Sequence, residues 1–168
     1  MAERAKRTVI AVGADNAGAA LKNVLRDQLA AEPDVEVVDF GVPDAENNTA
    51  YPYVGRDVAE AVARGEADRG LLVCGTGIGM AITANKVPGV RATVAHDAYS
   101  VERSVLSNNC QVLTLGARVI GSELAKRLVR EWLTYNFDPS SASAEKVALI
   151  DRFDAERSAA VPGPASAD

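Results

Sequence analysis

The amino-acid sequence predicts an α/β fold in which a parallel sheet is covered by helices on both faces. Short apolar runs of strand length alternate with amphipathic segments of helical length along the whole chain. Of the 168 residues, 48% are hydrophobic but only 5% are aromatic, so small residues supply most of the core. Small side chains let helices lie close on a sheet, and alternating elements favour parallel strands joined by right-handed crossovers.

The first half of the chain contains two strand patterns and two helix patterns. Its first apolar run is β-branched and ends at Gly13, which is typical of a buried strand. Helical spacing then places four apolar side chains, from Leu21 to Leu29, on one face. The predicted elements are a strand at 8–13, a helix at 17–31, a strand at 35–40, a loop at 41–50 and a helix from about Pro52 to Arg64.

The second half repeats this alternation and ends in a segment of different composition. The predicted elements are strands at 70–74, 91–95 and 111–115, and helices at 79–86, 99–106, 122–135 and 145–157. No linker interrupts them, so the sequence predicts a single domain over 1–157. Residues 158–168 contain mainly Ala, Pro, Ser and Gly and are expected to form a disordered tail.

Composition disfavours several classes of function. The net charge is −5 and no long Lys/Arg run occurs, so we expect no nucleic-acid partner. No signal peptide or membrane-spanning segment is found, which makes the cytoplasm the expected location. With two cysteines and one histidine, a zinc site of Cys and His ligands is not expected. The first glycine turn, Gly13 to Gly18, lacks the dinucleotide fingerprint, so no NAD is expected either.

Polar and reactive residues follow four of the predicted strands. Ligands of open α/β sheets bind beyond the carboxyl ends of the strands, so these residues mark the edge that would carry a site. The four segments are Gly13-Ala-Asp15-Asn16-Ala-Gly18, Cys74-Gly-Thr-Gly-Ile-Gly79, His96-Asp97 and Gly116-Ala-Arg118.

The glycine-rich turn after the third strand is the most informative of these segments. Its alternate glycines let the backbone expose successive N–H groups at a helix start, where they can hold an oxyanion or a phosphate. Cys74 directly precedes them, and a thiol beside a positive helix end gains thiolate character. A base next to an oxyanion site suits proton abstraction beside a carbonyl. A buried Cys beside an ordinary turn is the plain alternative.

Each other candidate also has two interpretations. Asp15 orients a substrate hydroxyl or caps the next helix, and Thr76 positions protons or satisfies the turn. His96 is either a site residue or a structural histidine. Arg118 binds phosphate or forms a surface ion pair, and the Asn108-Asn109 pair binds a carbonyl or hydroxyl, or forms a turn.

Taken together, these motifs resemble the family of ribose-5-phosphate isomerase B and galactose-6-phosphate isomerase. The resemblance covers about residues 8–155. It is carried by Gly13-Ala-Asp15, Tyr51-Pro52, Cys74-Gly-Thr-Gly-Ile-Gly79, Ala84-Asn-Lys86, Gly89-x-Arg91-Ala, Asn108-Asn109 and Gly116-x-Arg118.

The family resemblance implies a Rossmann-like (flavodoxin-like) three-layer sandwich with a five-stranded parallel sheet and a C-terminal helix. It implies aldose–ketose isomerisation through a cis-enediol without metal or cofactor. It also implies a homodimer, often paired into tetramers, whose active site lies at the subunit interface and takes residues from both subunits.

The family motifs also imply roles for individual residues of this chain. Cys74 takes the position of the base; some relatives carry a Glu base at the place of Met80. Thr76 matches a proton-handling hydroxyl, and Asp15 matches a contact to substrate hydroxyls. The substrate-binding residues expected on these grounds are Asn16, Tyr51, Gly75, Gly77, Ile78, Gly79, Asn108, Arg118 and Lys146.

Three departures from the family pattern bear on the substrate. Ser107 stands where ribose-5-phosphate isomerases of this type have the His that opens the sugar ring, and Asn16 replaces a phosphate-contacting His. The stretch 138–146 lacks the arginines that grip phosphate, although Lys146 is a candidate replacement. A tetrose 4-phosphate cannot close a five-membered ring and needs no ring-opening acid.

The sequence therefore favours interconversion of D-erythrulose 4-phosphate and D-erythrose 4-phosphate, a branch that segments 96–100, 106–109 and 116–121 resemble. Isomerisation of ribose 5-phosphate to ribulose 5-phosphate is the alternative. A non-catalytic module that binds sugar phosphates, and an isomerase of free sugars, also stay open.

Overall fold

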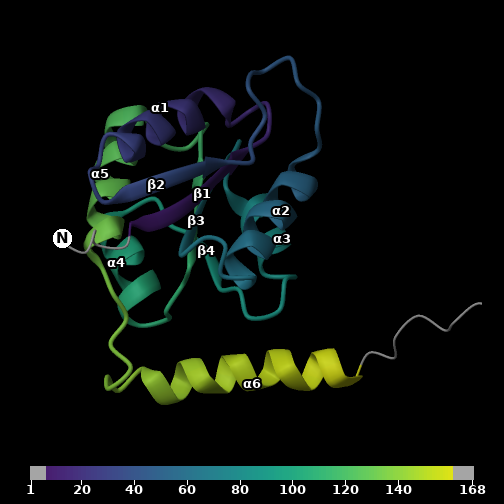
Figure 1. The fold of residues 1–168 in the computed structure, drawn as a ribbon, viewed down its shortest axis with the longest axis vertical. Helices are drawn as coiled ribbons and strands as arrows, with labels where there is room; N and C mark the ends of the chain where they lie inside the picture. Colours follow the sequence, from purple (N-terminus) through teal and green to yellow (C-terminus); the bar gives the residue numbers. More distant parts are fainter. Residues whose placement is uncertain (1–6, 161–168) are drawn as a thin grey trace, which may run out of the picture.

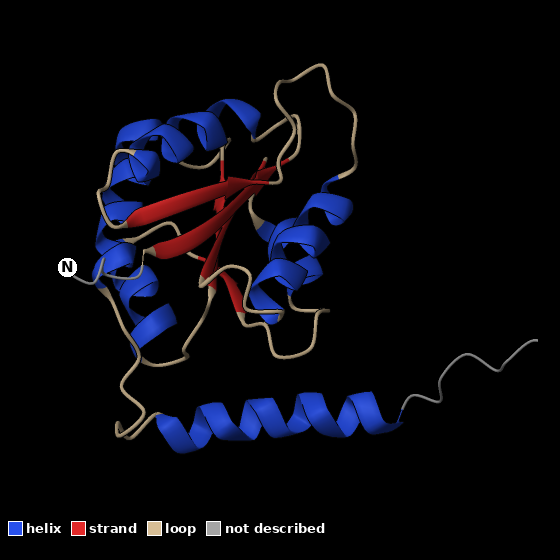
Figure 2. Cartoon of the chain, in the orientation of Figure 1, coloured by secondary structure: helices blue, strands red, loops and turns tan. Residues whose placement is uncertain are grey.

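The computed structural model describes residues 7–160 and contains a parallel sheet between two layers of helices (Figures 1 and 2). The strands are β1 (Thr8–Ala14), β2 (Val35–Asp39), β3 (Arg69–Cys74), β4 (Ala92–Val94) and β5 (Val112–Gly116). The helices are α1 (Ala19–Ala30), α2 (Tyr51–Ala63), α3 (Ile78–Ala84), α4 (Ala98–Leu106), α5 (Ser122–Thr134) and α6 (Ala144–Ala160). Every predicted element is present, with bounds within three residues of those expected.

All five strands are parallel and lie in the order β2-β1-β3-β5-β4. The predicted fold class is confirmed. The flavodoxin order places the fourth strand beside the third; here β5 takes that place and β4 forms the edge. Consequently β5 is a central strand, and it pairs with β3 from Gly70↔Val112 to Cys74↔Gly116.

Two apolar clusters hold the helices on the sheet. On one face, α1, α4 and α5 pack around Ile10, Leu25, Leu71, Leu115 and Trp132, all fully buried. On the other, α2 and α3 pack around a smaller cluster that includes Val58, Leu72, Met80 and Cys74. The short side chains of this second face bring α3 close to the ends of β3 and β5, where the glycine turn lies.

Helix α6 lies apart from the sandwich, along its β4 side (Figure 1). Polar contacts tie it to the segment before β4: Asp154 accepts from the Gly89 N–H at 2.9 Å, and Asp151 pairs with Arg91. Its apolar side chains Leu149, Ile150 and Phe153 are 41%, 44% and 62% exposed. The helix continues to Ala160, and the rest of the predicted tail lies outside the described residues.

None of the helices between residues 7 and 160 is long and apolar enough to cross a membrane.

Candidate active site

The turn between β3 and α3 places the Cys74 thiol against a backbone N–H group. Cys74 is the last residue of β3, and Gly77, the N-cap of α3, has a left-handed backbone with φ of 80°. This conformation folds the Gly77 N–H back, and it donates to Cys74 Sγ at 3.1 Å. Only glycine adopts such a φ freely. The thiol is therefore held with a backbone donor at its sulfur.

Strand β5 and the loop after it bind the carbonyl groups of the same turn. The Ala117 and Arg118 N–H groups donate to the carbonyls of Cys74 and Gly75 at 2.8 and 3.0 Å. The hydroxyl of Thr114, inside β5, donates to the Gly77 carbonyl at 2.9 Å. With its carbonyl oxygens directed toward β5, the turn has its amide hydrogens left for other partners.

Within residues 7–160, the N–H groups of Gly75, Thr76 and Gly79 have no assigned hydrogen-bond acceptor. Unpaired donors next to a reactive group form an oxyanion site, in which one donor is typically worth about 3–4 kcal/mol of barrier. Helix α3 has only seven residues, so its dipole is small. Discrete N–H groups, more than the helix dipole, therefore give this site its affinity for an anion.

Asp15 lies on the neighbouring loop, in the turn before α1. Its Oδ1 accepts from the Gly18 N–H at 3.0 Å, but Gly18 is the N-cap of α1 and no side chain caps that helix, so the predicted capping role is not observed. Gly18 packs directly on the end of β3, since a Cβ there would lie 2.3 Å from the Val73 carbonyl oxygen. Because Oδ1 alone makes this contact, Oδ2 stays available for a substrate hydroxyl.

Tyr51 and Arg118 lie on either side of the glycine turn. The Tyr51 ring covers Gly79, where a Cβ would come within 2.6 Å of Cε2. The Arg118 guanidinium lies over Gly75, with Nη1 3.3 Å from the position of a Cβ. Side chains at these two glycines would displace both groups. The structure thus places a phenol and a guanidinium next to the turn, as the sequence predicted.

The remaining candidates at this edge are accessible. Asn16 and Ile78 are exposed, beside Asp15 and at the start of α3. Thr76 is exposed as well, and its Oγ1 accepts from the Ile78 N–H at 3.3 Å. Thr76 is thus held in the turn with its hydroxyl hydrogen free to be donated. Met80 is fully buried, and its thioether cannot exchange protons.

His96 has a structural contact at the same edge. Its Nε2 accepts the Gly116 N–H at 2.9 Å and thereby joins the end of β4 to the end of β5. Burial lowers the pKa of His96, and the neighbouring Asp97 carboxylate opposes this effect. The neutral imidazole is the form that can accept this hydrogen bond, which favours the structural interpretation.

Asn108 and Lys146 do not join the other candidates within one chain. Asn108 precedes β5, whereas Cys74 pairs with Gly116 at the end of β5. The length of β5, about 13 Å at roughly 3.3 Å per residue, separates the two. Lys146 is exposed on α6, away from the sandwich (Figure 1). These residues reach Cys74 only if a second chain supplies them.

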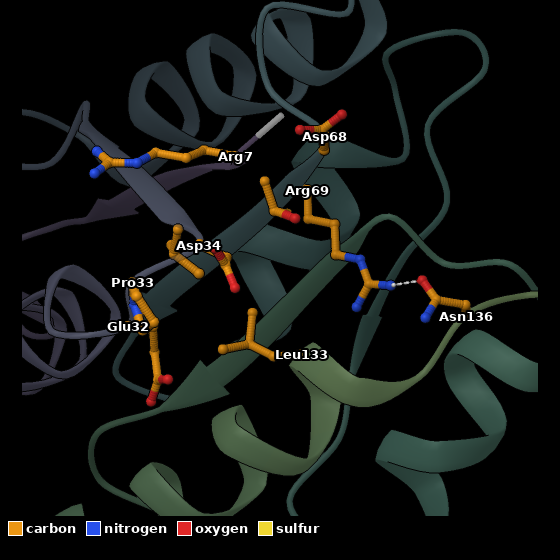
Figure 3. Close-up of a pocket in the computed structure, with 10 residues that line it drawn as sticks. Arg7, Glu32, Pro33, Asp34, Asp68, Arg69, Leu133 and Asn136 are labelled. Atoms are coloured by element: carbon orange, nitrogen blue, oxygen red, sulfur yellow. Dashed lines mark hydrogen bonds between the residues drawn. The ribbon is translucent and has the colours of Figure 1, made fainter. Parts of the chain in front are cut away.

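A charged cleft of about 450 Å³ lies at the opposite edge of the sheet (Figure 3). Arg69 lies in it, but its guanidinium donates to the carbonyls of Trp132 and Tyr135 and to Asn136 Oδ1. Burial lowers the pKa of Arg69. The acidic side chains of Glu32, Asp34 and Asp68 share the cleft with it. Arg69 is thus bound to two backbone carbonyls and to Asn136, and Arg7 also lines the cleft. The cleft contains none of the predicted catalytic residues.

Residues 10–150 match the family model described as Ribose/Galactose Isomerase. The chain belongs to this family. The predicted family, and with it the class of sugar-phosphate aldose–ketose isomerases, is therefore confirmed. The chain is 60% identical to D-erythrulose-4-phosphate isomerase 2 of Mycolicibacterium smegmatis, over 82% of this chain and 91% of that protein. It is 46% identical to D-erythrulose-4-phosphate isomerase of Pectobacterium atrosepticum, over 86% and 94%.

A solved structure of this family supports the fold in detail. Ribose-5-phosphate isomerase B of Clostridium thermocellum superposes with a TM-score of 0.84 and is 40% identical, over 89% of this chain and 99% of that one. The sheet and helices that position Cys74 are thus the family's own.

Proposed function

We propose that this isomerase interconverts D-erythrulose 4-phosphate and D-erythrose 4-phosphate. The observation that carries the proposal is the 60% identity to D-erythrulose-4-phosphate isomerase 2 over 91% of that relative. Identity to the ribose-5-phosphate isomerase B of known structure is 40%. Ser107 and Asn16, in place of the two histidines that ribose 5-phosphate needs, point in the same direction.

The proposed reaction moves one proton between neighbouring carbons. The Cys74 thiolate takes a proton from the hydroxyl-bearing carbon beside the carbonyl, and the C–H electrons form the enediolate while the carbonyl oxygen becomes an oxyanion. A proton passes from the hydroxyl oxygen to that oxyanion, a transfer that the Thr76 hydroxyl can relay. The Cys74 thiol then returns its proton to the former carbonyl carbon, and the second oxygen becomes the new carbonyl.

The proposed binding roles follow from which groups are free. The N–H groups of Gly75, Thr76 and Gly79 hold the enediolate oxygen. Asp15 Oδ2 accepts a hydrogen bond from a substrate hydroxyl. Arg118, which makes no ion pair within residues 7–160, offers its guanidinium to the phosphate.

The proposed enzyme works as a dimer or tetramer in the cytoplasm, as a single domain over 1–157. Two observations support the assembly: Asn108 lies at the wrong edge of the sheet for its own Cys74, and α6 exposes Ile150 and Phe153. A second chain would cover this apolar face and bring its Asn108, and its Lys146, to the Cys74 of the first. Light scattering at several protein concentrations tests the assembly, and a stable monomer would contradict it.

A substrate panel tests the reaction. We expect kcat/KM for D-erythrulose 4-phosphate to exceed that for ribose 5-phosphate by at least about 100-fold, because no residue replaces the ring-opening histidine. Unphosphorylated erythrulose is the matched control for the phosphate contacts. Equal or better kcat/KM with ribose 5-phosphate would assign the enzyme to the second candidate, which the similarity to the Clostridium structure supports.

The non-catalytic alternative is excluded or established by proton exchange. In heavy water, an isomerase incorporates deuterium at the carbon beside the substrate carbonyl, and NMR detects it. Saturable binding of D-erythrulose 4-phosphate without deuterium incorporation would identify a binding module instead.

A further inference from the structure

Thr114 is a fully buried polar residue that no motif of the family resemblance includes. It lies in the middle of β5, the strand next to β3, and its Oγ1 is 2.9 Å from the Gly77 carbonyl oxygen. The same Oγ1 is 3.2 Å from the Thr93 carbonyl oxygen in β4. A hydroxyl has a single hydrogen, so the two carbonyls compete, and the shorter distance favours Gly77.

We infer that Thr114 is a positioning residue for catalysis, because its hydroxyl holds the Gly77 peptide in the orientation that presents Cys74 and Thr76 to the substrate. This inference rests on the proposed role of Cys74. It adds a residue that touches neither the substrate nor the reacting atoms and acts only through the glycine turn.

Gly77 has a φ of 80° and no side chain of its own to fix the turn. Its two peptide planes would rotate at little cost without hydrogen bonds from neighbouring groups. The surrounding chain must hold them. A Cβ at Gly77 would also lie only 3.2 Å from Thr114 Oγ1, which shows how closely the hydroxyl packs on this backbone.

The next step follows the peptide planes on either side of Gly77. The Gly77 carbonyl and the Ile78 N–H belong to one rigid plane, in which they point in opposite directions. When Thr114 binds the carbonyl, the Ile78 N–H faces Thr76 Oγ1, to which it donates at 3.3 Å. The preceding plane carries the Gly77 N–H, which donates to Cys74 Sγ at 3.1 Å. The Thr114 hydroxyl thus binds the plane whose N–H contacts Thr76, and this plane adjoins, through Gly77, the plane whose N–H contacts Cys74.

A purely structural role, joining β5 to β4 through Thr93, is the competing explanation. The two strands are already paired by backbone hydrogen bonds from Ala92↔Val112 to Val94↔Thr114. The Gly77 carbonyl has a different position. Within residues 7–160 it accepts from the Ala81 N–H of α3 and from the Thr114 hydroxyl, and of these two donors the hydroxyl is the one that belongs to the sheet.

The variants Thr114→Ala and Thr114→Ser form a matched pair that tests the hydroxyl. Both lose the methyl group, and only the serine keeps the donor. Thermal unfolding of both variants measures how much stability each loses. If alanine leaves too little folded protein, Thr114→Val, which fills the same volume without a donor, replaces it.

Two measurements report positioning rather than stability. The first is kcat and KM for D-erythrulose 4-phosphate: we expect kcat to fall about tenfold in the alanine variant, with KM within about twofold, and serine to restore it. The second is the time profile of Cys74 alkylation by iodoacetamide at one fixed pH, which we expect to change in the alanine variant only. Asp15 and Arg118 are unchanged in both variants, so a difference reports the hydroxyl. Burial raises the pKa of the second thiol, Cys110, to about 11, and mass spectrometry of peptides separates its slow reaction.

Equal kcat values and equal alkylation profiles for the alanine and serine variants would overturn the inference. The alkylation profile needs no turnover, so it tests the positioning of the thiol even if Cys74→Ala proves active. In that case the proposed base would be wrong, whereas a changed profile would still establish the contact between Thr114 and the turn.

Discussion

The two edges of the sheet differ in what their polar groups are bound to. At the carboxyl edge, the carbonyls of the glycine turn are tied to β5, and the N–H groups of Gly75, Thr76 and Gly79 have no assigned acceptor within residues 7–160. At the amino edge, the cleft of Figure 3 is lined by several charged side chains. The guanidinium of Arg69 is already hydrogen-bonded there, because it donates to Trp132, Tyr135 and Asn136.

This difference in hydrogen bonding distinguishes the cleft at the amino edge from the candidate active site at the carboxyl edge. A guanidinium that already satisfies buried carbonyls stabilises the fold, and removing it for a ligand would leave those carbonyls unpaired. Unpaired donors beside a held thiol stabilise charge only when a reaction creates it. The carboxyl edge should therefore control turnover and the amino edge stability, except where a second chain joins the two.

The largest expected effect is that of Cys74→Ala. If this thiol is the base, kcat/KM for D-erythrulose 4-phosphate falls by about 10³-fold or more, because general base catalysis is lost. The melting temperature should change little, since the lost side chain is small. Cys110→Ala is the matched control and should keep activity. Turnover by the Cys74 variant near the wild-type rate would remove the carboxyl edge as the catalytic site proposed here.

The second prediction concerns Asn108, which lies at the amino edge of its own chain but is proposed to contact the substrate in the site of a second chain. Alone, Asn108→Ala should lower kcat/KM by about 10- to 100-fold through a lost substrate contact. Mixed and reassembled with Cys74→Ala chains, it should recover about a quarter of wild-type turnover, because half of the dimers are mixed and each has one complete site.

Complementation by these two chains would show that the site is built from both edges, one from each subunit. Mixtures that stay as inactive as their components, although subunit exchange is verified by mass spectrometry, would place Asn108 outside the site.

At the amino edge, Arg69→Met should affect stability and leave kcat/KM unchanged. Two carbonyls lose their buried donor, which should lower the free energy of unfolding by about 2–4 kcal/mol in urea titrations. Arg127→Ala is the control, because its ion pair with Glu131 is exposed and should contribute below about 0.5 kcal/mol. A large drop in kcat/KM for folded Arg69→Met would mean that the amino edge has a catalytic role of its own.

The sequence predicts the carboxyl edge well because strand ends are local features. A short apolar run followed by a glycine-rich turn marks the end of β3 and hence the place of Cys74, whatever lies next to it in the sheet. Element bounds and the turn itself follow from such patterns. The structure places Tyr51 and Arg118 beside the glycine turn and Asp15 on the loop after β1.

Thr114 and Arg69 could not be identified in this way, because their contacts depend on strand order. Thr114 meets Gly77 only since β5, and not β4, pairs with β3. Arg69 meets the carbonyls at the end of α5, more than sixty residues away in sequence. A polar residue inside an apolar run is a signal of a buried contact, but its partner requires the fold. Helix α6 is a third case, since we propose that a second chain covers its exposed apolar side chains.

The smallest expected effect is that of replacing His96, which should change the pH dependence of stability and leave turnover nearly unchanged. Because burial lowers the pKa of His96, the unfolded chain binds a proton below the ordinary value of about 6.5 that the native chain does not bind. His96 therefore destabilises the fold progressively as pH falls below that value, and has no such effect above it. Asp97, whose pKa is also lowered, contributes only in the more acidic range of carboxylates.

The variant His96→Gln keeps an acceptor for the Gly116 N–H but cannot titrate. Urea titrations should show that the free energy of unfolding depends less on pH between about 5 and 7 in this variant than in the wild type. The slopes should differ by the uptake of less than one proton on unfolding, and near pH 8 the free energy of unfolding should be little changed. Its kcat/KM at pH 8 should stay within about threefold of wild type, since Nε2 is bound to backbone and not to substrate. A much larger loss of turnover with unchanged stability would make His96 a catalytic residue, and polar groups at the carboxyl edge would then all belong to the site.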